Sequence, residues 1–125
     1  NAPIVKQKWI SDCIKKLIKN KKLTSVVPVL LNNDHNPLRA KQIKGKILKA
    51  FAKTKINISS NRQDLKKSFF LCHNFWVIKT KEIYKNNGEP PWNFMGKSVA
   101  PYIVNNSIDI HTMEDYYLAT ILLNK

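Results

Sequence analysis

Two side chains near the C-terminus have the types and the spacing of metal ligands. Asp109 and His111 lie two positions apart in residues 108–111, where apolar and polar residues alternate. Because neighbouring side chains of a strand point to opposite faces, this alternation predicts a strand end with both polar groups on one side. The pair could bind one cation, although Mg²⁺ prefers oxygen ligands to imidazole. By itself, the spacing is a weak signal for a metal site.

A second group of candidates could bind an anion. Arg62 and Gln63 are adjacent and would offer a guanidinium fork and an amide to a carboxylate or a sugar hydroxyl. Arg39 and His35 follow a buried-strand pattern, and open α/β sheets bind ligands beyond the carboxyl ends of their strands. His73, in an aromatic run, reads more simply as a structural histidine. Taken alone, each of these residues also has an ordinary structural explanation.

The elements that must position these side chains alternate between helix and strand. Apolar residues at helical spacing predict an amphipathic helix over residues 6–20, and a β-branched run predicts a buried strand over 24–31, with Pro28 near an edge or a bulge. Thr112 and Asp115 predict a capping box at the start of the last helix. The remaining expectations are a short strand or hairpin arm over 43–51, one or two strands over 69–78, a brief helix over 79–85, an aromatic loop over 92–96 and a strand over 99–104.

Length and composition limit the class of protein. The chain has 125 residues, of which 43% are hydrophobic, enough for one domain with a core. It has no run of 18 apolar residues and no signal-peptide pattern, so we expect a cytoplasmic protein without a membrane partner. Cys13 and Cys72 lack a metal or redox spacing and are expected to be buried hydrophobic residues. The start on Asn-Ala-Pro, without methionine, suggests a fragment.

The net charge of +14 raises the question of nucleic-acid binding. Only Arg39 and Arg62 among the 22 basic residues are arginines, and arginine is the side chain that forks onto phosphates and guanine edges. We therefore expect a solvated lysine surface that attracts anionic substrates, and nucleic acid as a partner is the alternative. The chain has three glycines and no P-loop, G-x-S-x-G, H-E-x-x-H or C-x-x-C pattern.

The order of these segments resembles that of the acylneuraminate cytidylyltransferases, the CMP–sialic acid synthetases and their relatives. The matching segments are S-V-V-P-V, D-H-N-P-L-R, N-R-Q-D-L, an aromatic strand, and S-I-D-I-H-T before a final helix. The resemblance covers the C-terminal portion of that catalytic domain, which is a Rossmann-like, three-layer α/β/α fold with a mixed sheet. It implies that residues 1–125 form a single partial domain. The family's L-A-R-x-G-S-K loop, which holds the CTP phosphates, has no counterpart here, so the chain alone is expected to be inactive.

The resemblance implies roles for individual residues. Arg39 and Arg62 would be catalytic, and Asp109 would match the first aspartate of the family's D-I-D metal motif, where His111 replaces the second. Pro3 would lie near the nucleotide. The sugar acid would contact Arg62, Gln63, Trp76 and Phe94.

The implied reaction joins CTP and a 2-keto sugar acid to give a CMP-sugar and pyrophosphate, with Mg²⁺ as cofactor. The family also implies a homodimer, with the aromatic loop at residues 92–95 at the subunit contact. Two alternatives stay open: a non-catalytic, basic nucleic-acid-binding domain, and a family member that has lost activity through the change to His111.

Overall fold

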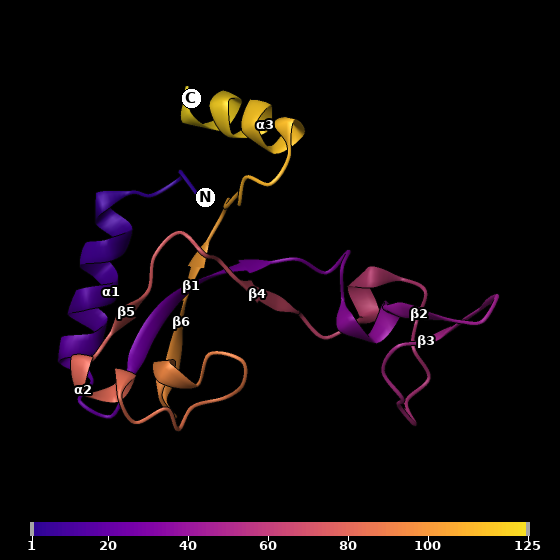
Figure 1. Cartoon of the computed structure of the whole chain (residues 1–125), viewed down its shortest axis with the longest axis horizontal. Coiled ribbons are helices and arrows are strands. Elements are labelled where there is room, and N and C mark those ends of the chain that lie inside the picture. The colour runs from indigo at the N-terminus through magenta and orange to yellow at the C-terminus, as the bar shows by residue number, and fades with distance from the viewer. Residues whose placement is uncertain (1, 125) are drawn as a thin grey trace. The chain divides into compact units, whose positions relative to one another are not determined.

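The computed structural model describes residues 2–124, which form two compact units (Figure 1). Unit 1 comprises the chain up to Leu30 and from Leu71 onward, and unit 2 comprises Leu31–Phe70. The helices are α1 (Gln7–Lys19), α2 (Thr80–Ile83) and α3 (Met113–Leu123). The strands are β1 (Ser25–Leu31), β2 (Lys41–Lys44), β3 (Ile47–Ala50), β4 (Phe69–Leu71), β5 (Val77–Ile78) and β6 (Val99–Val104). Short 3₁₀ turns cover Pro37–Arg39, Arg62–Asp64 and Asn93–Met95.

The main sheet is organised around β1. Parallel β6 pairs with it from Ser25 to Leu30, and antiparallel β5 pairs with Ser25 and Val26. β4 is a further neighbour of β1. A mixed sheet with three helices confirms the predicted α/β class.

Pro28 lies in the interior of this central strand, so of the two predicted settings, an edge or a bulge, the edge is wrong. Ser25 and Val26 have partners on both sides, because β5 and β6 pair with the same two residues. The antiparallel pairing with β5 ends at Val26, and the Pro28 carbonyl accepts a hydrogen bond from Cys72 N at 2.9 Å. Proline has no N–H to donate, and Pro28 lies just beyond the point where pairing between β1 and β5 ends. The sheet therefore loses less stability from the missing hydrogen bond than it would within a continuous ladder.

Side chains of β1 pack into two clusters. Val26 packs with Cys13 and Leu17 of α1, which lies beside the sheet, and with Ala100 of β6 (Figure 1). Val27 and Val29 pack with Met95. The alternation of a strand explains this division, because Val26 and its neighbour Val27 point to opposite faces. Neither cysteine forms a disulfide and both are buried, as predicted.

The N-terminal helix is confirmed, but its apolar stripe is only half covered. Cys13 and Leu17, four residues apart, are buried, whereas Ile18 is 72% exposed. The predicted capping box of the last helix is also confirmed, since Thr112 and Asp115 satisfy each other's backbone N–H groups. Within residues 2–124, no helix combines the length and the apolar character needed to cross a lipid bilayer.

The predicted strand at residues 108–111 is wrong. Residues 106–111 are irregular, although Ile108 and Ile110 are both partly buried. A strand needs a neighbour to take up its backbone hydrogen bonds, and no other strand among residues 2–124 pairs with this segment. Local alternation is therefore not sufficient to form a strand in this segment.

Unit 2 carries a hairpin of β2 and β3, in register from Lys41 with Ala50 to Lys44 with Ile47. Gly45, at φ 63°, supplies the left-handed conformation that the two-residue turn requires. The hairpin arm predicted over residues 43–51 is thus confirmed. Among residues 31–70, only Asn36 is buried. Unit 2 therefore has no apolar core of its own, and hydrogen bonds must order its loops.

Candidate functional site

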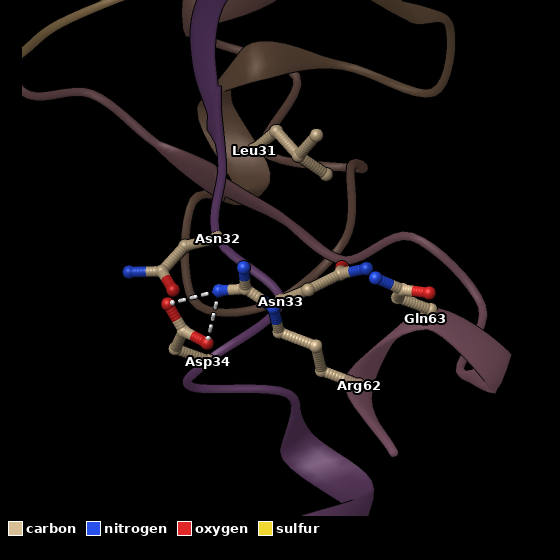
Figure 2. Close-up of a pocket in the computed structure, with 6 residues that line it drawn as sticks. All are labelled: Leu31, Asn32, Asn33, Asp34, Arg62 and Gln63. Atoms are coloured by element: carbon tan, nitrogen blue, oxygen red, sulfur yellow. Dashed lines mark hydrogen bonds and ion pairs between the residues drawn. The ribbon is translucent and has the colours of Figure 1, made fainter.

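A cavity of about 450 Å³ in unit 2 contains two of the predicted site residues. Residues 31–34 form one wall and residues 62–63 the other, and Figure 2 shows their side chains. The first wall begins at Leu31, the last residue of β1, and the second belongs to the 3₁₀ turn Arg62–Asp64. The lining residues are Leu31, Asn32, Asn33, Asp34, Arg62 and Gln63.

Asparagine side chains fix the first wall. Asn32 Oδ1 accepts a hydrogen bond from His35 N at 3.2 Å, which closes a turn over Asp34. Asn33 Oδ1 accepts from Ser68 N at 2.9 Å, and Ser68 Oγ donates to Asn32 O at 2.8 Å. Residues that are 35 positions apart in the sequence thus hold this loop, and most of the side-chain oxygens on this wall are already used.

The second wall is held by its own cap. Asn61 Oδ1 accepts from Gln63 N at 3.2 Å, and Ser59 Oγ donates to Asp64 Oδ2 at 2.7 Å. These bonds keep the Arg62 and Gln63 backbone in a 3₁₀ turn. A short polar segment without a core can be ordered in this way because asparagine and serine readily bond to nearby backbone.

Asp34 holds the Arg62 guanidinium inside this cavity. A single nitrogen, Nη1, lies 3.0 Å from Oδ1 and 3.2 Å from Oδ2 of Asp34, and Figure 2 shows the guanidinium beside this carboxylate. The side chains are 60% and 64% exposed. An ion pair this exposed contributes roughly 0–1 kcal/mol. A competing carboxylate can therefore displace Asp34 at little cost.

The remaining polar groups of the cavity are mainly donors. Within residues 2–124, the NH₂ groups of Asn32 and Asn33 and the Nη2 group of Arg62 donate no hydrogen bond. A guanidinium surrounded by amide donors suits a carboxylate whose neighbouring atoms also accept hydrogen bonds. The cavity can thus bind an organic anion.

Arg39 lies in unit 2 but does not line this cavity. It is exposed and lines a separate cavity of about 290 Å³ together with Asp34 and His35. Asp34 lines both cavities, so one carboxylate lies between the two arginine-containing sites. The structure thus places Arg62 and Gln63 in one cavity and Arg39 in another, and Asp34 is the one lining residue that these two cavities share.

Trp76 and Phe94, predicted to contact the sugar, lie together in unit 1 with ring centroids 5.7 Å apart. The rings of His73 and Trp92 complete the cluster, at 5.5 Å and 6.0 Å from Trp76. Trp76 Nε1 also donates to Cys72 O at 2.8 Å. These contacts, and the packing of Trp76, Trp92 and Phe94 against Val27, Val29 and Met95, give the cluster a structural role in addition to any contact with a ligand.

The remaining predicted site residues also belong to unit 1. Pro3 is exposed, and the carbonyl of Ile4 that follows it accepts a hydrogen bond from Asn74 Nδ2 at 2.9 Å. His111 Nε2 lies 3.3 Å from Asp109 Oδ2, so the structure brings these two side chains together without a strand. His111 is also held through its backbone, because its N–H donates to Asp115 Oδ2 at 3.1 Å.

The Asp109–His111 pair fits Mg²⁺ only through Asp109. Mg²⁺ in substrate complexes needs one or two carboxylates, with waters and phosphates completing its shell, whereas an imidazole is a poor ligand for it. Asp109 is partly buried and offers one carboxylate. In the part of the chain that the structure describes, no three His, Cys, Asp or Glu side chains form a metal-binding group.

Sequence reasoning had not selected several residues that the structure brings to these places. Asn32, Asn33 and Asp34 were part of a predicted loop, and the only signal for them was their density of side chains that bond to backbone. The contact of Trp92 with His73, at 5.6 Å, had no sequence signal. Comparison with protein-family models and with curated proteins gives no match to this chain.

Proposed function

We propose that the protein is a cytidylyltransferase that activates a 2-keto sugar acid with CTP, and that the cavity of unit 2 binds the carboxylate of the sugar. One observation carries the proposal: the adjacent Arg62 and Gln63 line a donor-rich cavity with the loop that follows β1. The family resemblance predicted these two residues as sugar-acid ligands from sequence order alone. The amide donors that line the cavity with them support that role.

The charges of the cavity suit such a substrate. The sugar carboxylate would bond to Arg62 and displace Asp34, whose exposed ion pair is weak. The amide groups of Asn32, Asn33 and Gln63 would donate to hydroxyl or keto oxygens near the carboxylate. The positive net charge of the chain would attract both anionic substrates.

The proposed reaction is a phosphoryl substitution. The anomeric hydroxyl of the sugar acid attacks the α-phosphate of CTP and loses its proton to solvent, while the bond between the α- and β-phosphates breaks and pyrophosphate leaves. Arg39 and Arg62 would position the two anions. Pro3 would lie near the nucleotide, and Asp109 would hold Mg²⁺, which when bound neutralises phosphate charge. We place the activity in the cytoplasm and in a homodimer.

Pyrophosphate release from CTP tests the activity. A full-length version that carries the family's CTP-phosphate loop should release pyrophosphate with at least one of a panel of 2-keto sugar acids. In that version, Asp109→Ala should lower kcat by at least about 100-fold, because it removes the carboxylate proposed for the metal. His111→Asp should restore or raise turnover, since it supplies the oxygen ligand that His111 lacks. Release by no member of the panel would contradict catalysis and favour an inactive relative.

A second candidate function is nucleic-acid binding, and the distribution of charge favours it. Residues 31–70 hold ten of the 22 basic residues and two of the eight acidic ones. Four of these lysines lie on the exposed hairpin, at positions 41, 44, 46 and 49. A titration with DNA and RNA at 50 and about 200 mM salt decides this, because phosphate-driven binding to several lysines weakens at least about 100-fold over that range. Salt-independent or absent binding excludes it.

A further inference from the structure

A second cavity, in unit 1, has a different character. Its volume is about 260 Å³, and its walls are mostly apolar. Trp92 forms one side, and Glu89 is its single charged residue. The lining residues are Leu71, Glu89, Pro90, Trp92, Met95 and Val99. Small-molecule sites have this composition, a mostly apolar surface with a few placed polar groups.

The loop that forms this cavity is fixed before any ligand arrives. Gly88 N donates to Asn93 O at 2.8 Å, and Met95 N donates to Trp92 O at 3.0 Å. A Cβ atom at Gly88 would lie 2.7 Å from Asn93 O, so only glycine permits this closure. Met95 is 4% exposed, and contacts with His73 and Trp76 hold the indole of Trp92. The cavity is therefore preformed, which lowers the entropic cost of binding.

Glu89 has no ion-pair partner among residues 2–124, although the chain is rich in lysine. Asp12, Asp34 and Glu82 each have a lysine or arginine partner, whereas Glu89 forms no ion pair or hydrogen bond with any residue from 2 to 124. Basic residues outnumber acidic ones by 22 to eight, so an unpaired carboxylate beside an apolar cavity is available to a cationic ligand.

We propose that this cavity binds a small organic cation with an apolar body, such as a quaternary or primary amine. The apolar part packs against Leu71, Met95 and Val99, and the positive charge lies between the Glu89 carboxylate and the Trp92 indole. Indole attracts cations through the negative face of its ring, and a nearby carboxylate adds to this attraction. The site is independent of the proposed sugar-acid cavity, whose polar groups select anions.

Choline and its neutral isostere 3,3-dimethylbutan-1-ol test this proposal, because they have nearly the same shape and differ in charge. Two-dimensional NMR titration of the ¹⁵N-labelled chain measures both affinities. We expect choline to shift the Trp92 indole signal and the amides of Met95 and Val99, and to bind at least about 5-fold more tightly than the isostere. Equal affinities for choline and the isostere, or shifts confined to other residues, would overturn the proposal. So would the absence of choline binding at about 20 mM, because even weak small-ligand sites fill at that concentration.

Two variants distinguish the effect of the Glu89 charge on choline binding from the effect of any other surface carboxylate. Glu89→Gln changes an exposed side chain and should keep the fold while it weakens choline binding about 3- to 10-fold, with no effect on the isostere. Glu114→Gln is the matched control, because Glu114 is also exposed and lies in the first turn of α3, away from the lining residues. Unchanged choline binding by Glu89→Gln, or equal loss in both variants, contradicts the proposed role of Glu89.

Discussion

Arg62 is held by one nitrogen and one exposed partner, and this arrangement leaves it able to exchange that partner. Asp34 occupies the place that a ligand carboxylate would take. Asp34→Asn removes the competing charge while it keeps the shape of the side chain, so we expect sugar-acid binding to tighten up to about 5-fold, the value of an exposed ion pair. Isothermal titration calorimetry measures this change. Weaker binding by Asp34→Asn would mean that Asp34 helps to hold the ligand.

The buried hydroxyl of Ser25 is expected to contribute nothing to the stability of the fold. Its Oγ is buried and, within residues 2–124, has no hydrogen-bond partner, whereas the neighbouring Thr24 Oγ1 accepts from Ser98 N at 3.0 Å. Ser25→Ala should leave the free energy of unfolding unchanged or raise it by up to about 1 kcal/mol, and Thr24→Val should lower it by about 1–2 kcal/mol. Urea denaturation of both variants checks this. A loss of stability in Ser25→Ala would reveal an unseen partner for the hydroxyl.

At the scale of elements, sequence patterns predicted most of the fold. Helical spacing located α1, β-branched runs located β1 and β6, and Thr112 with Asp115 located the start of α3. The prediction at residues 108–111 failed because alternation reports the direction of side chains, whereas a strand also requires a neighbour. The edge predicted as one setting of Pro28 failed for the related reason that a sequence does not show where one neighbouring strand ends and the next begins.

The cap of α3 gives this helix a pH-dependent start. Hydrogen bonds from the backbone N–H of His111, and from the hydroxyl and N–H of Thr112, hold the pKa of the Asp115 carboxyl below its ordinary value of 3.8. A lowered pKa means that the cap contributes fully above about pH 4 and is lost as the pH falls through the folded-state value. We therefore expect NMR shifts of residues 113–116 to stay helical from pH 7 to about 4.5 and to lose helical character below the ordinary carboxyl range.

Two variants check the origin of that transition. Thr112→Ala removes the hydroxyl that accepts from Asp115 N at 3.2 Å, and should cost the helix about 1 kcal/mol at neutral pH. Asp115→Asn should abolish the pH-dependent change in the first turn, because the amide does not titrate. The account of the cap would be contradicted if the transition persisted in Asp115→Asn.

At the scale of the whole molecule, the two units differ in how they are held together. Unit 1 has apolar clusters on both sides of β1, whereas unit 2 depends on asparagine and serine hydrogen bonds around Asn32, Asn33 and Asn36. Hydrogen bonds near solvent contribute little net stability, so unit 2 should open first. Limited proteolysis with trypsin should cut between Arg39 and Lys67 before it cuts α1, although α1 also carries exposed lysines at positions 15, 16 and 19. Earlier cleavage within α1 would contradict this order.

This difference also explains why the candidate site was less predictable than the fold. Arg62 and Gln63 could be selected from the sequence because their residue types suit an anion and their order resembles that of a family. Asp34, Asn32 and Asn33 could not be selected, because their role depends on contacts with Ser68 and Arg62, which lie 28 to 36 positions away. Loops that are ordered by long-range polar contacts leave no periodic pattern in a sequence.

The central claim is that Arg62 binds the carboxylate of a sugar acid, and calorimetric titration with N-acetylneuraminic acid and with its methyl ester tests it most directly. The ester keeps the sugar and removes the charge. We expect the native chain to bind the acid and to bind the ester at least about 10-fold more weakly. Arg62→Ala should bind the acid at least about 10-fold more weakly than the native chain does. Both effects follow because a charge-assisted hydrogen bond contributes about 1.5–3 kcal/mol. Lys49→Ala is the control, because it removes a positive charge from the exposed hairpin of the same unit. This variant should bind the acid with the same affinity as the native chain. Equal binding of acid and ester, or an unchanged affinity in Arg62→Ala, would contradict the account.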